Sequence, residues 1–164
     1  MDLSNRETKH SGKQDSPHGL VEVTFDLEDQ DLPYVTETVW AEPLGKDLYR
    51  LRNVPYIIRG FSEQDIVTAV DDDGRLKVTG RATSGGHSAY RIYLQEDSTR
   101  VDFASAWVPL KSLGCTYERA TDRVIAVDVP PEADMFAVYG LLQEGERSGK
   151  WNFEEGHCAH PLRE

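Results

Sequence analysis

A short loop in the middle of the chain, Ser84-Gly85-Gly86-His87, carries residue types that could do chemistry. Glycines can expose backbone N–H groups to an anion, and His87 and Arg91 lie close by in the sequence. The loop precedes a predicted strand rather than a helix, so it has no helix dipole and matches no phosphate-binding fingerprint. We interpret these residues as a flexible joint, with a ligand-binding loop as the alternative.

Three arginines form a second candidate group. Arg50 and Arg52 project from the same face of one predicted strand, and Arg59 follows a few residues later. Basic side chains grouped in an acidic chain could bind a carboxylate or a phosphate. Such a row more often pairs with acidic side chains of a neighbouring strand, which is the interpretation we favour. The three arginines remain candidate contacts for a ligand or a partner.

The segment His157-Cys158-Ala159-His160 groups three potential metal ligands near the end of the chain. Zinc usually takes four ligands from two separated pairs, and a second pair is missing. Cys115 completes such a set only if the fold brings it close. We therefore predict no metal and no cofactor, and we expect residues 159–164 to form a frayed tail. The two cysteines are interpreted as free thiols of a reducing cytosol.

Catalytic motifs do not occur in this sequence. It contains no Gly-x-Ser-x-Gly, His-Glu-x-x-His or Walker-type pattern. Trp40, Trp107 and Trp151 each lie in a predicted element beside apolar neighbours, which favours core packing over base stacking. The sequence therefore gives no positive indication of an enzyme, although it does not exclude one.

The charge restricts the classes of partner. The chain has 18 basic and 29 acidic residues among 164, which gives a net charge of −11. Such a surface repels phosphate backbones and anionic lipids, so we expect neither nucleic-acid nor membrane binding. The charge either keeps the protein soluble or steers it toward a basic protein partner. We expect a monomer or a homodimer.

Residues 1–18 contain almost no apolar side chains, and we predict a disordered tail there. The start of the sequence lacks an apolar segment typical of a secretion signal, and no stretch is long enough to cross a membrane. These observations predict a cytoplasmic protein.

The first half, residues 19–83, is predicted to be a β-rich subdomain. Residues 21–27 alternate between apolar and polar side chains, which is typical of a half-buried strand. Further strands are predicted over residues 35–41, 47–53 and 66–70, and Asp72-Asp73-Gly74 predicts a hairpin turn into residues 75–81. Several short strands without a helix favour a small barrel or a curled antiparallel sheet.

The second half follows the glycine-rich joint at residues 84–86 and spans residues 87–158. Strands are predicted at residues 90–94, 115–119, 123–129 and 151–155, and helices at about 101–113 and after Asp134. Pro109 indicates that the first helix is kinked or starts late. The order β-α-β-β-α-β is that of a ferredoxin-like unit, whose first and third strands are central. The fold class is therefore α+β.

Several short motifs resemble one bacterial family, catalogued as domain of unknown function 4265. They are Tyr49-x-x-x-Asn53-Val54-Pro55, Gly60 with Asp65-Ile66-Val67, Ser84-Gly85-Gly86-His87-Ser88, Leu113-Gly114-Cys115-x-x-Glu118, Val127-Asp128-Val129-Pro130 and Gly149-x-Trp151. The resemblance spans most of residues 20–156, and Gln64 stands where the family pattern has glycine. It implies a bacterial cytoplasmic protein and brings no activity or catalytic residues.

Our leading hypothesis is a non-enzymatic module that binds a protein partner or a small ligand in the cleft expected between the two subdomains. A basic partner, as in antitoxin or immunity proteins, is its sharpest form. The alternative is a small enzyme with its site at the junction, where His87 acts with acidic or arginine neighbours.

Overall fold

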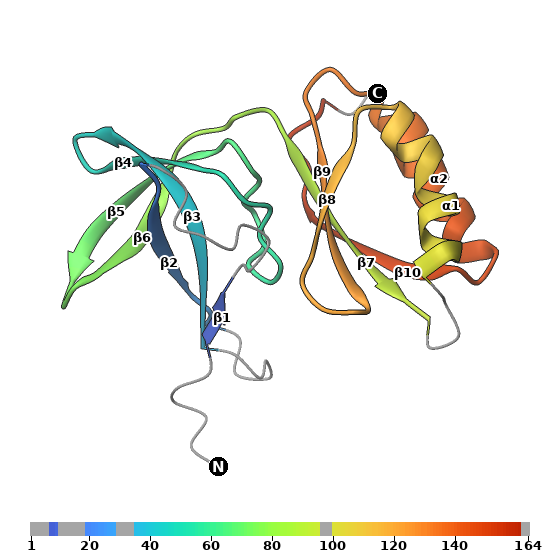
Figure 1. Cartoon of the computed structure of the whole chain (residues 1–164). Helices are drawn as coiled ribbons and strands as arrows, with labels where there is room; N and C mark the ends of the chain where they lie inside the picture. Colours follow the sequence, from blue (N-terminus) through green and yellow to red (C-terminus); the bar gives the residue numbers. More distant parts are fainter. Residues whose placement is uncertain (1–6, 10–18, 29–34, 96–99, 162–164) are drawn as a thin grey trace, which may run out of the picture.

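The computed structural model of this chain describes residues 7–9, 19–28, 35–95 and 100–161 (Figure 1). The chain forms two units that lie side by side. A β-barrel occupies one side, and a sheet covered by two helices occupies the other.

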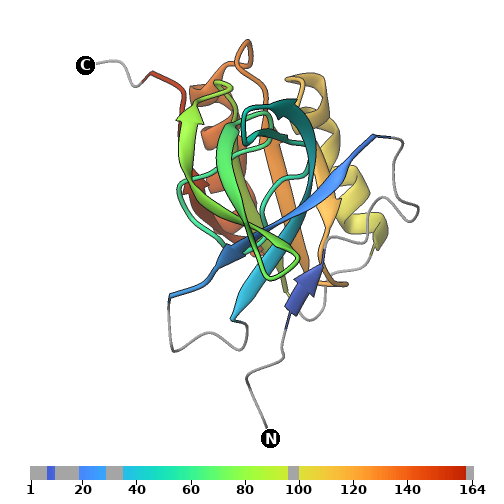
Figure 2. The ribbon, with the colours of Figure 1, turned by 90° about the vertical axis from the view of Figure 1, so that its left-hand side faces the viewer.

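The barrel closes because one long strand pairs on both sides along its length. Its strands are β2 (Val21–Asp26), β3 (Thr36–Gly45), β4 (Leu48–Leu51), β5 (Ile66–Asp72) and β6 (Arg75–Thr83). The first part of β3 pairs with β2 and its last part pairs with β4. A parallel pairing of β2 with β6 completes the ring (Figure 2). The sheet is therefore curled, as the sequence indicates, although the β2–β6 pairing that closes the ring is parallel rather than antiparallel.

The interior of the barrel is apolar. It contains Val23, Phe25, Val39, Leu51 and Val67, each of them at most 3% exposed. The alternation of apolar and polar residues along β2 places Val23 and Phe25 inward, because successive side chains of a strand point to opposite faces. The predicted hairpin is confirmed, since β5 and β6 pair from Asp72 and Arg75 back to Ile66 and Thr83.

One short strand lies within the segment predicted to be disordered. Residues Glu7–Lys9 form β1, which pairs in parallel with Thr36–Thr38 of β3. The prediction is wrong for these three residues because pairing to a strand edge uses backbone groups and needs no apolar side chains. The rest of the predicted tail, residues 1–6 and 10–18, lies outside the described residues.

The second unit is a four-stranded antiparallel sheet in the order β10-β7-β9-β8. Along the chain its elements are β7 (Ser88–Leu94), α1 (Arg100–Ser112), β8 (Thr116–Arg119), β9 (Val124–Val129), α2 (Met135–Arg147) and β10 (Trp151–His157). The first and third strands of the unit, β7 and β9, lie at the centre of the sheet. The side chain of Asp134 caps α2 by accepting from the N–H groups of Phe136 and Ala137. Helix α1 begins at Arg100 and continues through Pro109, so it does not start late.

The two faces of this sheet are covered differently. Both helices lie on one face, where Tyr90, Ile92, Ile125 and Val127 join the main apolar core. The intervening positions point to the other face, where the loop between β4 and β5 packs against the small side chains of Ala89 and Ala126. The barrel is therefore joined to the sheet by a loop that fills the space between them.

Candidate functional site

The β4–β5 loop is fixed by a buried carboxylate. Glu37 of β3 is 0% exposed. The backbone N–H groups of Tyr56, Ile57 and Ile58 donate to it, with N···O distances of 2.6, 3.1 and 2.8 Å. Three such bonds satisfy a carboxylate that is otherwise costly to bury. Sequence reasoning missed Glu37, whose only signal is an acidic residue within an otherwise strand-forming run.

Arg91, a predicted ligand contact, lies inside this packed region. Its side chain is 1% exposed. It donates to the carbonyl of Ile58 and lies 3.6 Å from the Glu154 carboxylate. Burial lowers the pKa of Arg91, while Glu37 and Glu154 act in the opposite direction. The guanidinium nevertheless stays charged at any ordinary pH. It acts in this structure as the cation that balances the two carboxylates.

A second link joins the family motifs around Asn53 and Glu118. The Asn53 side chain accepts from the N–H of Trp40 at 2.8 Å and donates to Glu118 at 2.9 Å. The N–H of Val54 also donates to Glu118, at 3.3 Å. Asn53 belongs to the barrel side and Glu118 to β8, so these two residues connect the units. Their spacing of 65 residues left no local sign of this role.

The glycine-rich loop is held in place. The Asp65 carboxylate accepts from the N–H of Gly85 at 2.9 Å and from that of Ser62 at 3.0 Å, and Arg81 lies 3.6 Å away. A Cβ atom at Gly85 would lie 2.5 Å from the backbone oxygen of Gln64. Close packing therefore requires glycine at position 85. The loop, predicted as a flexible joint, is held by these contacts.

Gln64 itself adopts a backbone φ of +73°. A residue with a side chain therefore occupies the left-handed region at this position, a conformation that favours glycine.

His87 pairs with an acidic residue of β9. Its Nδ1 lies 2.8 Å from the Asp128 carboxylate, which is itself buried. This hydrogen bond raises the pKa of His87, partial burial opposes the rise, and Glu63 and Glu132 add to it. The predicted enzyme site combined His87 with acidic or arginine neighbours, and the His87–Asp128 pair is the contact that corresponds to it.

The cysteine near this pair is not activated. Burial, with a smaller contribution from Asp128, raises the pKa of Cys115 to about 12. A thiol with such a pKa is not a nucleophile near neutral pH.

His157 and His160 are both anchored, so the expectation of fraying is wrong for His160. His157 lies 2.8 Å from the hydroxyl of Ser62. His160 is only 8% exposed and lies 2.6 Å from the hydroxyl of Ser88 and 2.8 Å from the carbonyl of Pro130. The segment is held by long-range contacts that no local pattern reports. Within the described residues, no cluster of three His, Cys, Asp or Glu side chains could hold a metal ion.

The three predicted arginine contacts lie in ion pairs. Arg50 and Arg52 both approach Glu42 of β3, at 3.5 and 3.0 Å. Arg59 pairs with Glu154 of β10 at 3.1 Å and is 70% exposed. The sequence analysis favours pairing with acidic side chains of a neighbouring strand, and Arg50 and Arg52 pair in this way with Glu42 of β3. The fold brings Arg59 and Arg91 together at Glu154 and leaves Arg50 and Arg52 apart from them.

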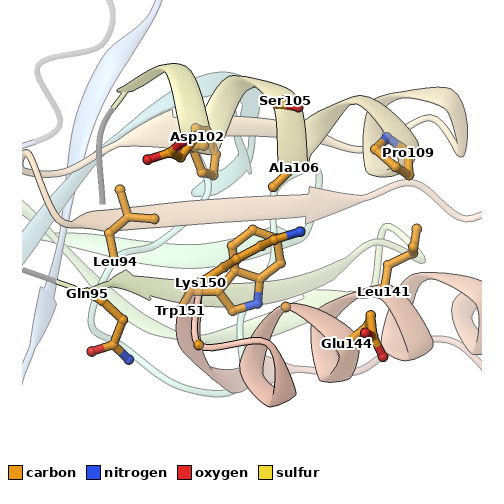
Figure 3. Close-up of a pocket in the computed structure, with 13 residues that line it drawn as sticks. Leu94, Gln95, Asp102, Ser105, Ala106, Pro109, Leu141, Glu144, Lys150 and Trp151 are labelled. Atoms are coloured by element: carbon orange, nitrogen blue, oxygen red, sulfur yellow. The ribbon is translucent and has the colours of Figure 1, made fainter. Parts of the chain in front are cut away.

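A large cavity lies elsewhere, between α1 and α2 (Figure 3). This interhelical groove has a volume of about 770 Å³. Trp151 and Phe103 contribute aromatic surface, and Leu94, Ala106, Pro109 and Leu141 contribute aliphatic surface. Polar groups lie among them, including the carboxylates of Asp102 and Glu144 and the ammonium group of Lys150. Both helices lie on the side of the sheet away from the barrel, so the groove lies on that side (Figure 1).

The position of Trp151 depends on one glycine. A Cβ atom at Gly145 would lie 2.1 Å from the indole ring. The indole N–H donates to the carbonyl of Leu142 at 3.0 Å, which fixes the ring beneath α2. Sequence reasoning assigned Trp151 to the core, which is correct, but it could not show that the helices leave a groove beside it.

These features define a class of α+β protein in which a small barrel is clamped to one face of a sheet and two helices with a groove cover the other. The chain belongs to the family described as domain of unknown function (DUF4265), whose model matches residues 37–153. The fold is similar to that of a hypothetical protein from Neisseria gonorrhoeae, with a TM-score of 0.74 and 15% identity over 88% of this chain and 99% of that one. No curated protein matches the sequence.

In the part of the chain that the structure describes, no helix has the length and hydrophobicity needed to span a membrane.

Proposed function

We propose that this protein is a non-enzymatic binding module that takes a basic segment of a partner protein into the interhelical groove. The observation that carries the proposal is the groove itself. Its volume of about 770 Å³, its aromatic floor and its polar groups combine shape with chemical selectivity. The junction predicted as the cleft is instead filled by the β4–β5 loop, and this moves the expected site to the helices.

Charge supports a basic occupant. The groove has two carboxylates, Asp102 and Glu144, against one ammonium group, Lys150. The whole chain carries a net charge of −11, which attracts a basic partner from a distance and accelerates encounter. An apolar floor within an acidic protein fits a segment that alternates basic and apolar side chains, and an antitoxin- or immunity-like role would require such a basic partner.

The architecture and location that accompany this proposal are also inferences. The β-α-β-β-α-β order with central first and third strands supports a ferredoxin-like second subdomain at residues 87–158, after a β-rich subdomain at 19–83. We place the protein in the bacterial cytoplasm as a monomer or homodimer, without nucleic-acid or membrane partners.

The proposal is tested by capturing partners on the immobilised protein in low and high salt. Ser105→Arg places a positive charge in the groove, and Val108→Arg places the same charge on the same helix at a position that is 58% exposed and does not line the groove. A basic protein should be retained at low salt, released at high salt and lost with Ser105→Arg but not with Val108→Arg. Salt-independent retention, or equal behaviour of the two variants, contradicts the proposal.

A small enzyme at the junction is the second candidate, favoured by the 2.8 Å contact between His87 and Asp128. The pair resembles a general base held by a carboxylate. It predicts a turnover that His87→Ala abolishes without unfolding the protein. Activity that survives this substitution removes the assignment. Burial raises the pKa of the Cys115 thiol, and Ser88 is 0% exposed, so neither of these two neighbours is presented to a substrate as a nucleophile.

A further inference from the structure

A second cavity, of about 440 Å³, lies beside α2 and is lined by different residues of that helix from those that line the groove. We call it the aromatic pocket. Its walls come from α2, β7 and β10, and the lining residues are Tyr90, Met135, Phe136, Tyr139, Gly140, Gln143 and Glu155. The volume falls within the range of roughly 300–1,000 Å³ that is typical of small-ligand sites.

Aromatic rings at several inclinations dominate this pocket. The Tyr139 ring lies 6.4 Å from the Tyr90 ring and 5.5 Å from the Phe153 ring, with interplanar angles of 68° and 80°. Tyr139 is 41% exposed and Phe136 is 55% exposed, which is unusual for such large apolar side chains. The face of an aromatic ring carries a partial negative charge that attracts a cation.

One carboxylate lies in the wall of the pocket. Glu155 accepts a hydrogen bond from the Tyr90 hydroxyl at 2.9 Å, so its position is fixed while the residue remains exposed. No lysine, arginine or histidine is among the described residues that line the pocket. The electrostatic potential of the rings and that of the carboxylate therefore have the same sign, and both attract a cation.

We infer that the aromatic pocket binds the alkylammonium group of an organic cation. An anion would meet Glu155 and the ring faces, both of which repel it. A divalent metal requires several oxygen ligands, and the lining offers a single carboxylate. A neutral apolar molecule would leave the fixed carboxylate unused. An alkylammonium group uses both the rings and the charge.

The aromatic pocket shares no lining residue with the interhelical groove, so cation binding is tested separately. Choline and its neutral carbon isostere, 3,3-dimethylbutan-1-ol, are titrated into the labelled protein and followed by NMR chemical shifts. Choline should bind roughly two- to thirty-fold more tightly than the isostere, which is the range expected for a cation over aromatic rings. Equal binding of the two, or no saturable shift with choline at millimolar concentrations, overturns the inference.

Variants locate the site. Glu155→Gln keeps the shape and removes the charge, and Tyr139→Leu keeps an apolar side chain and removes the ring; both should weaken choline binding. Tyr117→Leu is the matched control, since Tyr117 is a similarly exposed tyrosine (38%) on β8 and does not line the pocket. Choline binding that withstands both pocket substitutions, in variants shown by circular dichroism to be folded, contradicts the assignment.

A further titration distinguishes the two sources of such a cation. Nα-acetyl-lysine methylamide presents the ammonium group of a lysine side chain, as a partner protein would. Tighter binding of choline indicates a free quaternary ammonium compound, and tighter binding of the lysine derivative indicates a partner's side chain. Either result supports the chemistry of the pocket and decides which ligand it serves.

Discussion

The two faces of the β10-β7-β9-β8 sheet are built on opposite principles. The helix-covered face is joined by large apolar side chains, among them Tyr90, Ile92 and Trp107, and it retains cavities beside the helices. The barrel-covered face is joined through buried and half-buried polar groups, mainly Glu37, Arg91 and the Asn53–Glu118 pair, beside a small apolar cluster. Directional hydrogen bonds fix one docking geometry on the barrel-covered face, whereas both described cavities of this unit lie beside the helices. The functional surface is therefore expected on the apolar face.

The largest effect should come from the polar face. Glu37→Ala leaves three loop N–H groups without their acceptor and removes a carboxylate near Arg91. We expect the free energy of unfolding to fall by about 3–5 kcal/mol, as for a broken buried ion pair. Urea denaturation measures it. Glu42→Ala, which removes an exposed carboxylate of the same strand, should cost less than about 1 kcal/mol. Equal losses would show that the polar face does not determine the docking.

The apolar face can be tested with two glycines of α2. Gly145→Ala brings a methyl group against the Trp151 indole and should lower the free energy of unfolding by about 1–3 kcal/mol. Gly140→Ala meets nothing within 4 Å and should raise it by up to about 1 kcal/mol, because alanine favours the helix. Thermal melts of both variants compare the signs. A stabilising Gly145→Ala would mean that Trp151 is not packed against the helix.

A smaller effect should depend on pH. The hydrogen bond with Asp128 raises the pKa of His87 in the folded protein above its value of about 6.5 in the unfolded chain. The resulting stabilisation is complete below that value and is lost as the pH rises through the folded pKa. The difference in unfolding free energy between the wild type and His87→Gln should therefore be larger at about pH 5.5 than at about pH 8.5.

The comparison with His87→Gln is necessary because His157 titrates in the opposite sense. Burial lowers the pKa of His157, so its contribution is lost as the pH falls. This contribution is shared by both proteins and cancels in the difference. A difference that does not change with pH would mean that His87 carries no charge at Asp128.

The smallest effect should come from the exposed edge of the polar face. Arg59 is 70% exposed and pairs with Glu154, so Arg59→Ala should change the free energy of unfolding by at most about 1 kcal/mol. Chemical denaturation in low and high salt checks this. A loss comparable to that of Glu37→Ala would show that the rim, rather than the buried groups, holds the units together.

Sequence reasoning succeeded where structure is set by near neighbours. The alternation along β2, the Asp72-Asp73-Gly74 turn and the Asp134 cap each depend on a few adjacent residues, and each is confirmed. The order of elements in the second unit is likewise as predicted. These features follow from backbone preferences and side-chain period, which one sequence displays directly.

The site was harder to predict because its contacts join distant residues. Asn53 and Glu118 are 65 residues apart, and Ser88 and His160 are 72 apart. The motifs that contain Asn53 and Glu118 are visible in the sequence. Their residues pair across the junction, however, and a single sequence does not show which residues pair. The groove and the aromatic pocket depend on how the helices lie on the sheet, which periodicity leaves open.

The long-range contacts of residues 156–160 affect when the two units can lock during synthesis. Gly156 and His157 hold the barrel side through Gly60 and Ser62, and His160 holds the start of β7. These contacts span about 70–95 residues, and such long-range contacts form late. A growing chain can form the barrel early, but the last strand must emerge before the two units lock. Until residues 156–160 have been synthesised, the β4–β5 loop has Glu37, Arg91 and Glu118 as partners but lacks its contact with Gly156, and the two units cannot lock.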